Sequence, residues 1–283
     1  MLITNRKQII VNFLRRIYLL QLFDYLRYLL DLKKNQLNNK VFIENNPDFQ
    51  LPPPDLAYDV LGHTNWNSYY WSGKEHAQYI SNLIKENVVH KDLITICEWG
   101  CGAARILRHI PLFFSERSIN LYGFDYNLRA IQWCSNNIPS IAFKHNLLSP
   151  PLPQESNTFD CLYCLSVFTH LSDEMHIQWI RELSRVVKPN GLIILTTHGD
   201  LTRANLLNHE AQEYDAGKLV VRGMVKEGKR TFVAYHPPSF IRNELLKDFT
   251  VISHITNPIP KSLSQDIWVV RNTKNSNENR QNY

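Results

Sequence analysis

The chain has 283 residues, of which 44% are hydrophobic, so it is long enough to bury one sizeable core and still carry an extension. Its net charge of +5 is uneven, because residues 1–40 carry eight Lys or Arg against two Asp or Glu, and the remainder sums to about −1. A body so close to neutral is not a nucleic-acid binder by charge, and we expect no nucleic-acid partner.

Residues 9–32 form an apolar and aromatic run that is interrupted by Arg15, Arg16, Asp24 and Arg27. The run is too often interrupted for a membrane span, and a secretory signal would not carry the Arg15-Arg16 pair in its apolar region. We therefore expect a cytoplasmic protein with an N-terminal helix whose apolar sides are covered. The cover is either its own domain or a second subunit, or else the inner membrane surface, with residues 1–34 in peripheral contact with anionic lipid. The oligomeric state stays open.

The composition then changes to Asn and Lys, followed by Leu51-Pro52-Pro53-Pro54. This pattern predicts that residues 33–55 form a linker without helix or strand, which separates an extension at 1–55 from a domain at 56–271. The aromatic segment 56–70 is expected to cover the ligand edge of that domain. Ser72 is expected to cap a helix over residues 73–87.

Around Glu98 an apolar run ends, two glycines follow, and a helical pattern begins at once. This order predicts a strand at 94–98, a tight turn at Gly100 and Gly102, and a helix at 104–111. Glycines permit positive φ and let a ligand lie against bare backbone, and the helix N-terminus offers unpaired N–H groups to a carboxylate or phosphate. A purely structural turn is the alternative.

A second strand at 119–124 ends at Asp125, so Glu98 and Asp125 are expected at the same carboxyl edge of a parallel sheet. Asp125 is then placed to accept both hydroxyls of a ribose, and Tyr126 can stack on a base. A dinucleotide fold requires a third glycine at the position of Arg105. A guanidinium at that position suits a ligand that carries a carboxylate.

The remaining pattern alternates between helices and strands. We expect helices at 127–137 and 173–187 and strands at 141–144, 159–165 and 191–197, which together predict an α/β fold with a doubly wound parallel sheet. A hairpin at 218–235, a helix at 238–246 and strands at 249–255 and 265–270 follow, and the Asn-rich tail 272–283 is expected to be disordered. Cys161 and Cys164 fall inside a buried strand, so we expect reduced core thiols and no metal.

Taken together, these motifs resemble the class I S-adenosylmethionine-dependent methyltransferases. The resemblance covers roughly residues 72–200. It implies a seven-stranded, mostly parallel sheet, S-adenosylmethionine (AdoMet) as cofactor, S-adenosylhomocysteine as product, and a substrate pocket shaped by an insertion at 201–236. It is carried by Glu98-Trp99-Gly100-Cys101-Gly102, Gly123-Phe124-Asp125, Asn146 with Pro150-Pro151-Leu152-Pro153, Phe159-Asp160-Cys161-Leu162-Tyr163, Ser166-Val167-Phe168-Thr169-His170-Leu171, and the segment 183–191.

The resemblance also implies which side chains meet the cofactor. Asn146 has an amide that can pair with an adenine edge, although a simple turn-forming Asn is the alternative. Tyr69, Tyr70 and Gly73 would approach the methionine end or the substrate, unless the two tyrosines are core aromatics. Glu98 and Asp125 are expected to stay ionised through cofactor contacts and not to act as bases. The cofactor-binding set is Glu98, Gly100, Gly102, Arg105, Asp125, Tyr126, Asn146, Leu147 and Ser166.

A sulfonium methyl is already activated, so its transfer mainly requires alignment of the reacting atoms. An oxygen acceptor must also lose a proton, for which histidine is the natural base near neutral pH. Our candidates, in order, are His198 after the fifth strand, His170 after the fourth, and His236 at the end of the hairpin. We predict methyl transfer to an oxygen of a small or medium-sized acceptor such as a glycan, lipid or natural product. The alternatives are a nicotinamide oxidoreductase and a non-catalytic AdoMet-binding scaffold at a membrane.

Overall fold

A seven-stranded sheet forms the centre of the protein, in the order β3-β2-β1-β4-β5-β9-β8. The computed structural model describes residues 2–88, 91–260 and 262–273. Strands β1 to β5 pair in parallel, and β9 runs antiparallel between β5 and β8, as the sequence predicts. The strands are β1 (Leu93–Trp99), β2 (Ser118–Asp125), β3 (Ala142–His145), β4 (Phe159–Cys164), β5 (Val187–Thr197), β8 (Phe249–Ile255) and β9 (Asp266–Asn272).

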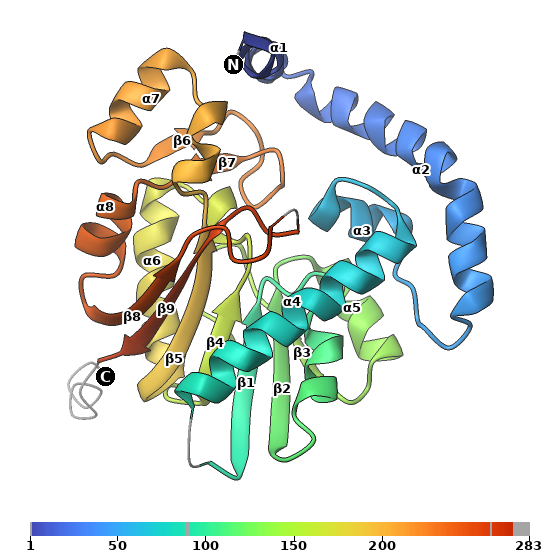
Figure 1. Ribbon diagram of the computed structural model, residues 1–283, viewed down its shortest axis with the longest axis vertical. Coiled ribbons are helices and arrows are strands. Elements are labelled where there is room, and N and C mark those ends of the chain that lie inside the picture. The colour runs from blue at the N-terminus through green and yellow to red at the C-terminus, as the bar shows by residue number, and fades with distance from the viewer. Residues whose placement is uncertain (1, 89–90, 261, 274–283) are drawn as a thin grey trace.

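Helices cover both faces of this sheet (Figure 1). One apolar core joins Ile80 and Ile84 to β1, and the other joins Trp179 and Leu183 to β4, which explains why β4 is buried along its whole length. The α-helices are α1 (Leu2–Arg16), α2 (Leu20–Asn45), α3 (Pro54–Leu61), α4 (Trp66–Asn87), α5 (Leu128–Asn137), α6 (Asp173–Val186), α7 (Asn208–Asp215) and α8 (Pro238–Phe240), and a π-helix follows at Ile241–Leu245.

The strand order reverses between β1 and β4. The chain leaves β1 toward β2 and β3 on one side, and returns to β4 and β5 on the other. In a sheet of this kind, the carboxyl ends of the central strands open into a crevice at the reversal. The ends of β1, β2 and β4 therefore define where a ligand can enter.

The N-terminal region contradicts the predicted linker. Two helices are present in place of one, and α2 continues through residues that we expected to be unstructured. Asn39 explains the extension, because its Nδ2 donates to Thr64 O at 2.7 Å and its Oδ1 accepts from Trp66 N at 2.9 Å. Phe42 is buried beside Trp66. Two of the Asn residues that indicated a linker, Asn35 and Asn39, thus make helix-to-body contacts.

Two further expectations about helices were wrong. Helix α4 begins at Trp66 with Asn65 as its cap, whose side chain accepts from Ser68 N at 2.9 Å, and Ser72 lies inside the helix. The helix expected at 104–111 is a 3-10 helix at Leu107–Phe113. Ala104 has a φ of 54° and Pro111 lacks an N–H, so a regular α-helix cannot form across this stretch.

The insertion contains the expected hairpin, in a shorter form, with β6 (Val220–Arg222) paired to β7 (Val233–Tyr235). At the C-terminus, Asn272 belongs to β9 and not to a tail, because its side-chain amide donates to Ser184 O and Val187 O. The tail residues 274–283 lie outside the described residues. All five cysteines are buried and free.

Candidate functional site

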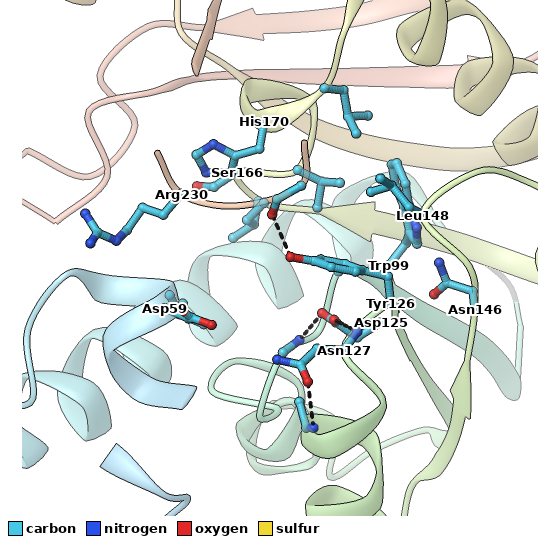
Figure 2. A pocket seen from close by; sticks show the side chains of 18 of the residues that line it. Asp59, Trp99, Asp125, Tyr126, Asn127, Asn146, Leu148, Ser166, His170 and Arg230 are labelled. Atoms are coloured by element: carbon cyan, nitrogen blue, oxygen red, sulfur yellow. Dashed lines mark hydrogen bonds between the residues drawn. The ribbon is translucent and has the colours of Figure 1, made fainter. Parts of the chain in front are cut away.

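A cavity opens at the carboxyl ends of β1, β2 and β4 (Figure 2). Its wall combines the loops after these strands with α3 and with the tip of the insertion. The structure thereby brings together most of the residues that the sequence pointed to, and adds others. The lining includes Asp59, Trp99, Gly100, Gly102, Asp125, Tyr126, Asn127, Asn146, Leu147, Leu148, Ser166, His170, Gly228 and Arg230.

The loop after β1 presents bare backbone to the cavity. Gly100 has a φ of 78°, and a Cβ there would stand 2.3 Å from Val167 Cγ2. The Gly100 and Cys101 N–H groups donate to Phe124 O at 2.7 and 3.0 Å, which closes the turn against β2. Only glycine satisfies both the conformation and the close approach at position 100.

Asp125 ends β2 and faces the same cavity. Its Oδ2 accepts from Gly102 N and its Oδ1 from Asn127 N, each at 2.7 Å. The side chain is buried, which raises the pKa of Asp125, while these two hydrogen bonds act in the opposite direction. Each carboxylate oxygen retains a second lone pair, so the group can still accept hydroxyl donors from a ligand.

Asn146 contributes a side-chain amide whose oxygen accepts no hydrogen bond from the described residues. Its Nδ2 donates to Leu147 O at 2.6 Å, whereas its Oδ1 is buried and has no hydrogen-bond partner among the described residues. A buried acceptor without a donor is costly, so a ligand N–H is the expected partner. Leu147 itself lines the cavity with a side chain that is 66% exposed.

The tip of the insertion closes over this side of the cavity. Gly228 N donates to His170 O, and Gly228 O accepts from Tyr126 Oη, both at 3.0 Å. Gly228 has a φ of 80°, and a Cβ there would stand 2.8 Å from Leu148 Cδ1. The hairpin tip is therefore fitted to the loops of the sheet, in keeping with an insertion that shapes the pocket.

Arg230, next to this tip, links the cavity to the N-terminal extension. Its Nη2 lies 2.6 and 2.7 Å from the two carboxylate oxygens of Asp24 in α2, and its guanidinium stands over the ring of Tyr58. Asp59 of α3 lines the cavity as well, and pairs with Lys229 at 3.0 Å. No local motif marks these residues, because partners about 200 positions apart leave no pattern in the sequence.

A second cavity adjoins the first at Gly100 and Ser166 and is lined by Glu98 and Arg105. Arg105 is buried, with Nη1 3.0 Å from Ser72 Oγ and Nη2 3.2 Å from His76 Nδ1. Its Nε has no hydrogen-bond partner among the described residues. A buried guanidinium with a free N–H is suited to bind a carboxylate.

Glu98 is buried at the end of β1 and lines this second cavity. Its Oε2 accepts from Leu107 N and from Tyr163 Oη, both at 3.1 Å. Burial nevertheless raises the pKa of Glu98 to about 8, because removal from water outweighs these bonds and the attraction of Arg105. The protonated form therefore predominates at neutral pH.

Ser166 sits at the start of the loop after β4 and lines both cavities. It has a φ of 60°, which is uncommon for a residue with a side chain. Ser166 N donates to Thr196 Oγ1 at 2.7 Å, and its Oγ bonds Gln265 Oε1 at 3.1 Å. These contacts to β5 and to the segment before β9 hold the strained residue where the two cavities meet.

The three candidate histidines occupy different surroundings. His170 lines the first cavity, and its Nδ1 donates to Phe232 O at 2.7 Å, which leaves Nε2 as the acceptor nitrogen. His198 does not line that cavity, and its Nδ1 donates to Ala234 O at 3.0 Å. His236 is fully buried, with its Nε2 2.8 Å from His176 Nε2. Of the three candidates, only His170 lines the first cavity.

Burial lowers the pKa of all three candidates, to about 4 for His198. Each is therefore neutral near pH 7. Of the three, only His170 combines a neutral ring with a place in the cavity wall.

Tyr69, Tyr70 and Gly73 line neither cavity. Tyr69 is buried and donates to Ala103 O at 3.0 Å, and Tyr70 packs on Phe49 with ring centroids 4.9 Å apart. A Cβ on Gly73 would stand 2.3 Å from Arg105 O. These residues support the β1 loop from behind and do not form a lid, so the core alternative holds for both tyrosines.

Residues 97–195, from β1 to β5, match a family described as "Methyltransferase domain". The chain is 23% identical over 223 residues to a ubiquinone biosynthesis O-methyltransferase of Rickettsia prowazekii (strain Madrid E), covering 76% of this chain and 83% of that protein. It is 24% identical over 188 residues to the tRNA N(3)-methylcytidine methyltransferase trm140 of Schizosaccharomyces pombe. That match covers 60% of this chain and 59% of the relative, so the chain spans less than two thirds of trm140.

Solved structures share the fold. DesVI of Streptomyces venezuelae superposes with a TM-score of 0.52 at 12% identity, covering 78% of this chain and 99% of DesVI. The PH0226 protein of Pyrococcus horikoshii OT3 gives 0.51 at 16% identity, covering 76% and 94%. The domain match falls on the strands and loops that build the cavity, and the sheet has the seven mostly parallel strands that were expected. Over residues 97–195 the chain is therefore similar to methyltransferases in sequence, and its fold is shared with these solved structures.

Proposed function

We propose that the protein transfers the methyl group of AdoMet to an oxygen atom of a small or medium-sized acceptor, such as a glycan, lipid or natural product. The observation that carries this proposal is the placement of His170 in the cavity wall with Nδ1 bound to a carbonyl and Nε2 free to accept a proton. An oxygen acceptor needs such a base, whereas a thioether or a tertiary amine would not. The O-methyltransferase among the relatives agrees with this choice.

The side chains around the cavities fit AdoMet. Asp125 supplies lone pairs for the ribose hydroxyls, and the unmet Asn146 Oδ1 suits the adenine amino group. Gly100 lines the cavity without a side chain, and Arg105 offers its unpaired Nε–H to the methionine carboxylate. When bound, the cofactor supplies a methyl group that is activated on a sulfonium. We assign Glu98 a supporting role behind the loop, through its bond to Leu107 N.

His170 then acts as the general base in our proposal. Its Nε2 takes the proton of the acceptor hydroxyl as the oxygen attacks, and its Nδ1–H remains bound to Phe232 O, which stabilises the charged ring. The lowered pKa keeps the ring neutral and ready to accept at pH 7. A base of this kind contributes roughly 10²–10⁴-fold in rate. The tip of the insertion lies beside His170, whose carbonyl oxygen accepts from Gly228 N.

The acceptor class is tested by following the label from tritiated AdoMet in a cell extract. We expect tritium in a small organic product that is resistant to ribonuclease and protease, and that can be identified by its mass. The His170→Gln variant should give much less product at the same AdoMet concentration. Label that is released by ribonuclease would instead assign an RNA acceptor, as the names of the tRNA methyltransferases among the relatives suggest.

A further inference from the structure

The two N-terminal helices expose an apolar surface that no described residue covers. Figure 1 shows α1 and α2 as an arc on the outside of the molecule. Leu30 and Leu37 are 70% and 73% exposed, which is far more than expected for leucines on a helix that packs on a core. The surface, called the outer face below, is built mainly from Ile9, Phe13, Leu22, Leu26, Leu30 and Leu37.

Specific contacts fix which side of these helices points outward. Arg15 is 5% exposed and donates to Arg222 O at 2.7 Å and to Gly223 O at 3.1 Å. Asp24 holds Arg230, and Asp31 Oδ2 accepts from Thr64 N at 2.6 Å. Both acidic residues of the segment 8–40 are therefore bonded to the body of the protein, and Asp31 also lines a recess between α2 and α3.

Four other cations of the same segment lie at the surface, whereas Arg15 is buried. Arg16, Arg27, Lys33 and Lys34 are exposed, and none has an ion-pair partner among the residues that the structure describes. Arg27 and Lys34 lie two helical turns apart on either side of Leu30, and all three border one shallow recess between α2 and α3. Apolar side chains and unpaired cations thus share one surface.

We propose that this outer face docks on an anionic lipid bilayer, with α1 and α2 lying along its surface. Apolar side chains would enter the boundary between headgroups and acyl chains, while the four cations meet lipid phosphates. A second copy of the chain is a poorer occupant, because a symmetric pairing sets each patch on itself and would bring two sets of these cations into one interface. None of the described helices has the length and hydropathy of a membrane span, so docking would be peripheral.

The test is sedimentation of the full chain with vesicles of phosphatidylcholine alone, or of phosphatidylcholine with about one third phosphatidylserine. Binding to the anionic vesicles is expected to exceed binding to neutral ones and to weaken with salt, because surface attraction is screened within about 10 Å at 0.1 M. Replacing both cations beside the recess (R27E with K34E) should weaken binding at least about 25-fold, since each cation contributes about fivefold.

Single variants separate the apolar contribution from a general effect of surface charge. Leu30→Asp should lower binding to anionic vesicles at least tenfold. Leu112→Asp changes a leucine of similar exposure (60%) at the 3-10 helix of the body, and should leave binding nearly unchanged. AdoMet affinity, measured by calorimetry, should stay the same in every variant, so failure of docking is distinguished from failure of the cofactor site.

Equal sedimentation with neutral and anionic vesicles, or equal losses in Leu30→Asp and Leu112→Asp, would overturn the proposal. So would a stable dimer in light scattering that Leu30→Asp dissociates, because the outer face would then be occupied by a second copy of this chain.

Discussion

Asp125 lies at the cavity wall and holds the glycine loop in place. Its Oδ2 accepts from Gly102 N, and its Oδ1 accepts from Asn127 N. Asp125→Asn keeps one acceptor oxygen for the loop but loses the charge. We expect AdoMet affinity to fall about 10- to 100-fold, because a charge-assisted hydrogen bond contributes about 1.5–3 kcal/mol. Calorimetry on the folded variant measures this, with the exposed Asp215→Asn as control. Unchanged affinity would remove Asp125 from the cofactor site.

The proposed role of His170 as general base predicts how kcat/KM depends on pH. A base must be neutral to accept a proton, so kcat/KM should be low when the ring is charged, rise as pH increases through its pKa, and then level off. Burial lowers this pKa from its ordinary value of 6.5, so the midpoint of the rise should lie below that pH. His170→Gln should cost about 10²–10⁴-fold in turnover and leave AdoMet affinity within a few-fold.

His198→Gln is the matched control for this profile. His198 also donates its Nδ1–H to a carbonyl of the insertion, but it lies outside the cavity, so its variant should keep near-normal turnover. Equal losses in the two variants would show that these histidines support the insertion and that neither is the base.

At the scale of elements, the hairpin tip is predicted to complete the cofactor site. In Gly228→Val, the side chain would meet Leu148 and force a branched residue into a φ of 80°, so the contact with Tyr126 should be lost. We expect AdoMet affinity to fall about tenfold, with a small change in melting temperature because the tip lies outside the main sheet. Gly223→Val is the control, because a Cβ at Gly223 would lie 3.6 Å from its nearest neighbour, Phe232 Cε2, which is an ordinary contact distance. Similar effects of both would contradict the role of the tip.

The sheet could be predicted from the sequence because its signals are local. A buried run such as β4 and the alternation of strands with helices do not depend on distant residues. The same holds for Gly100 and Asp125, whose roles follow from their places at the ends of β1 and β2. The end of helix α2 could not be predicted, because asparagines in a sequence indicate a linker. The hydrogen bonds by which Asn39 joins the helix to Thr64 and Trp66 form only in the folded chain.

The rest of the site depends on pairs that only the folded chain brings together. Arg230 reaches the cavity because Asp24 holds it, and the insertion tip closes because Gly228 meets Tyr126. The choice between His170 and His198 depended on which loop turns toward the cavity, and the residue pattern is the same for both. Sequence therefore located the edge of the sheet that carries the cavity, whereas the contacts of the insertion required the structure.

For the whole molecule, Glu98 predicts a dependence of stability on pH. Its pKa of about 8 in the folded protein exceeds the ordinary value of 4.5, so between these values the folded state holds a proton that the unfolded state releases. Stability should therefore fall as pH rises through this window, by at most about 1.4 kcal/mol per pH unit from this group.

Glu98→Gln stays neutral at every pH and should remove that slope. Urea unfolding at pH 5.5 and 7.5 compares this variant with the wild type, with the exposed Glu116→Gln as control. As pH rises, the free energy of unfolding of the wild type should fall relative to that of Glu98→Gln. Parallel behaviour of all three proteins would show that Glu98 is ionised in the folded state.

The most direct measurement of the central claim is a calorimetric titration of the protein with AdoMet, followed by one with NADH. The account predicts one AdoMet site per chain that S-adenosylhomocysteine competes for, no heat of binding with NADH, and much weaker AdoMet binding in Asp125→Asn. Binding of NADH in place of AdoMet would contradict the account and assign the crevice to the nicotinamide cofactors.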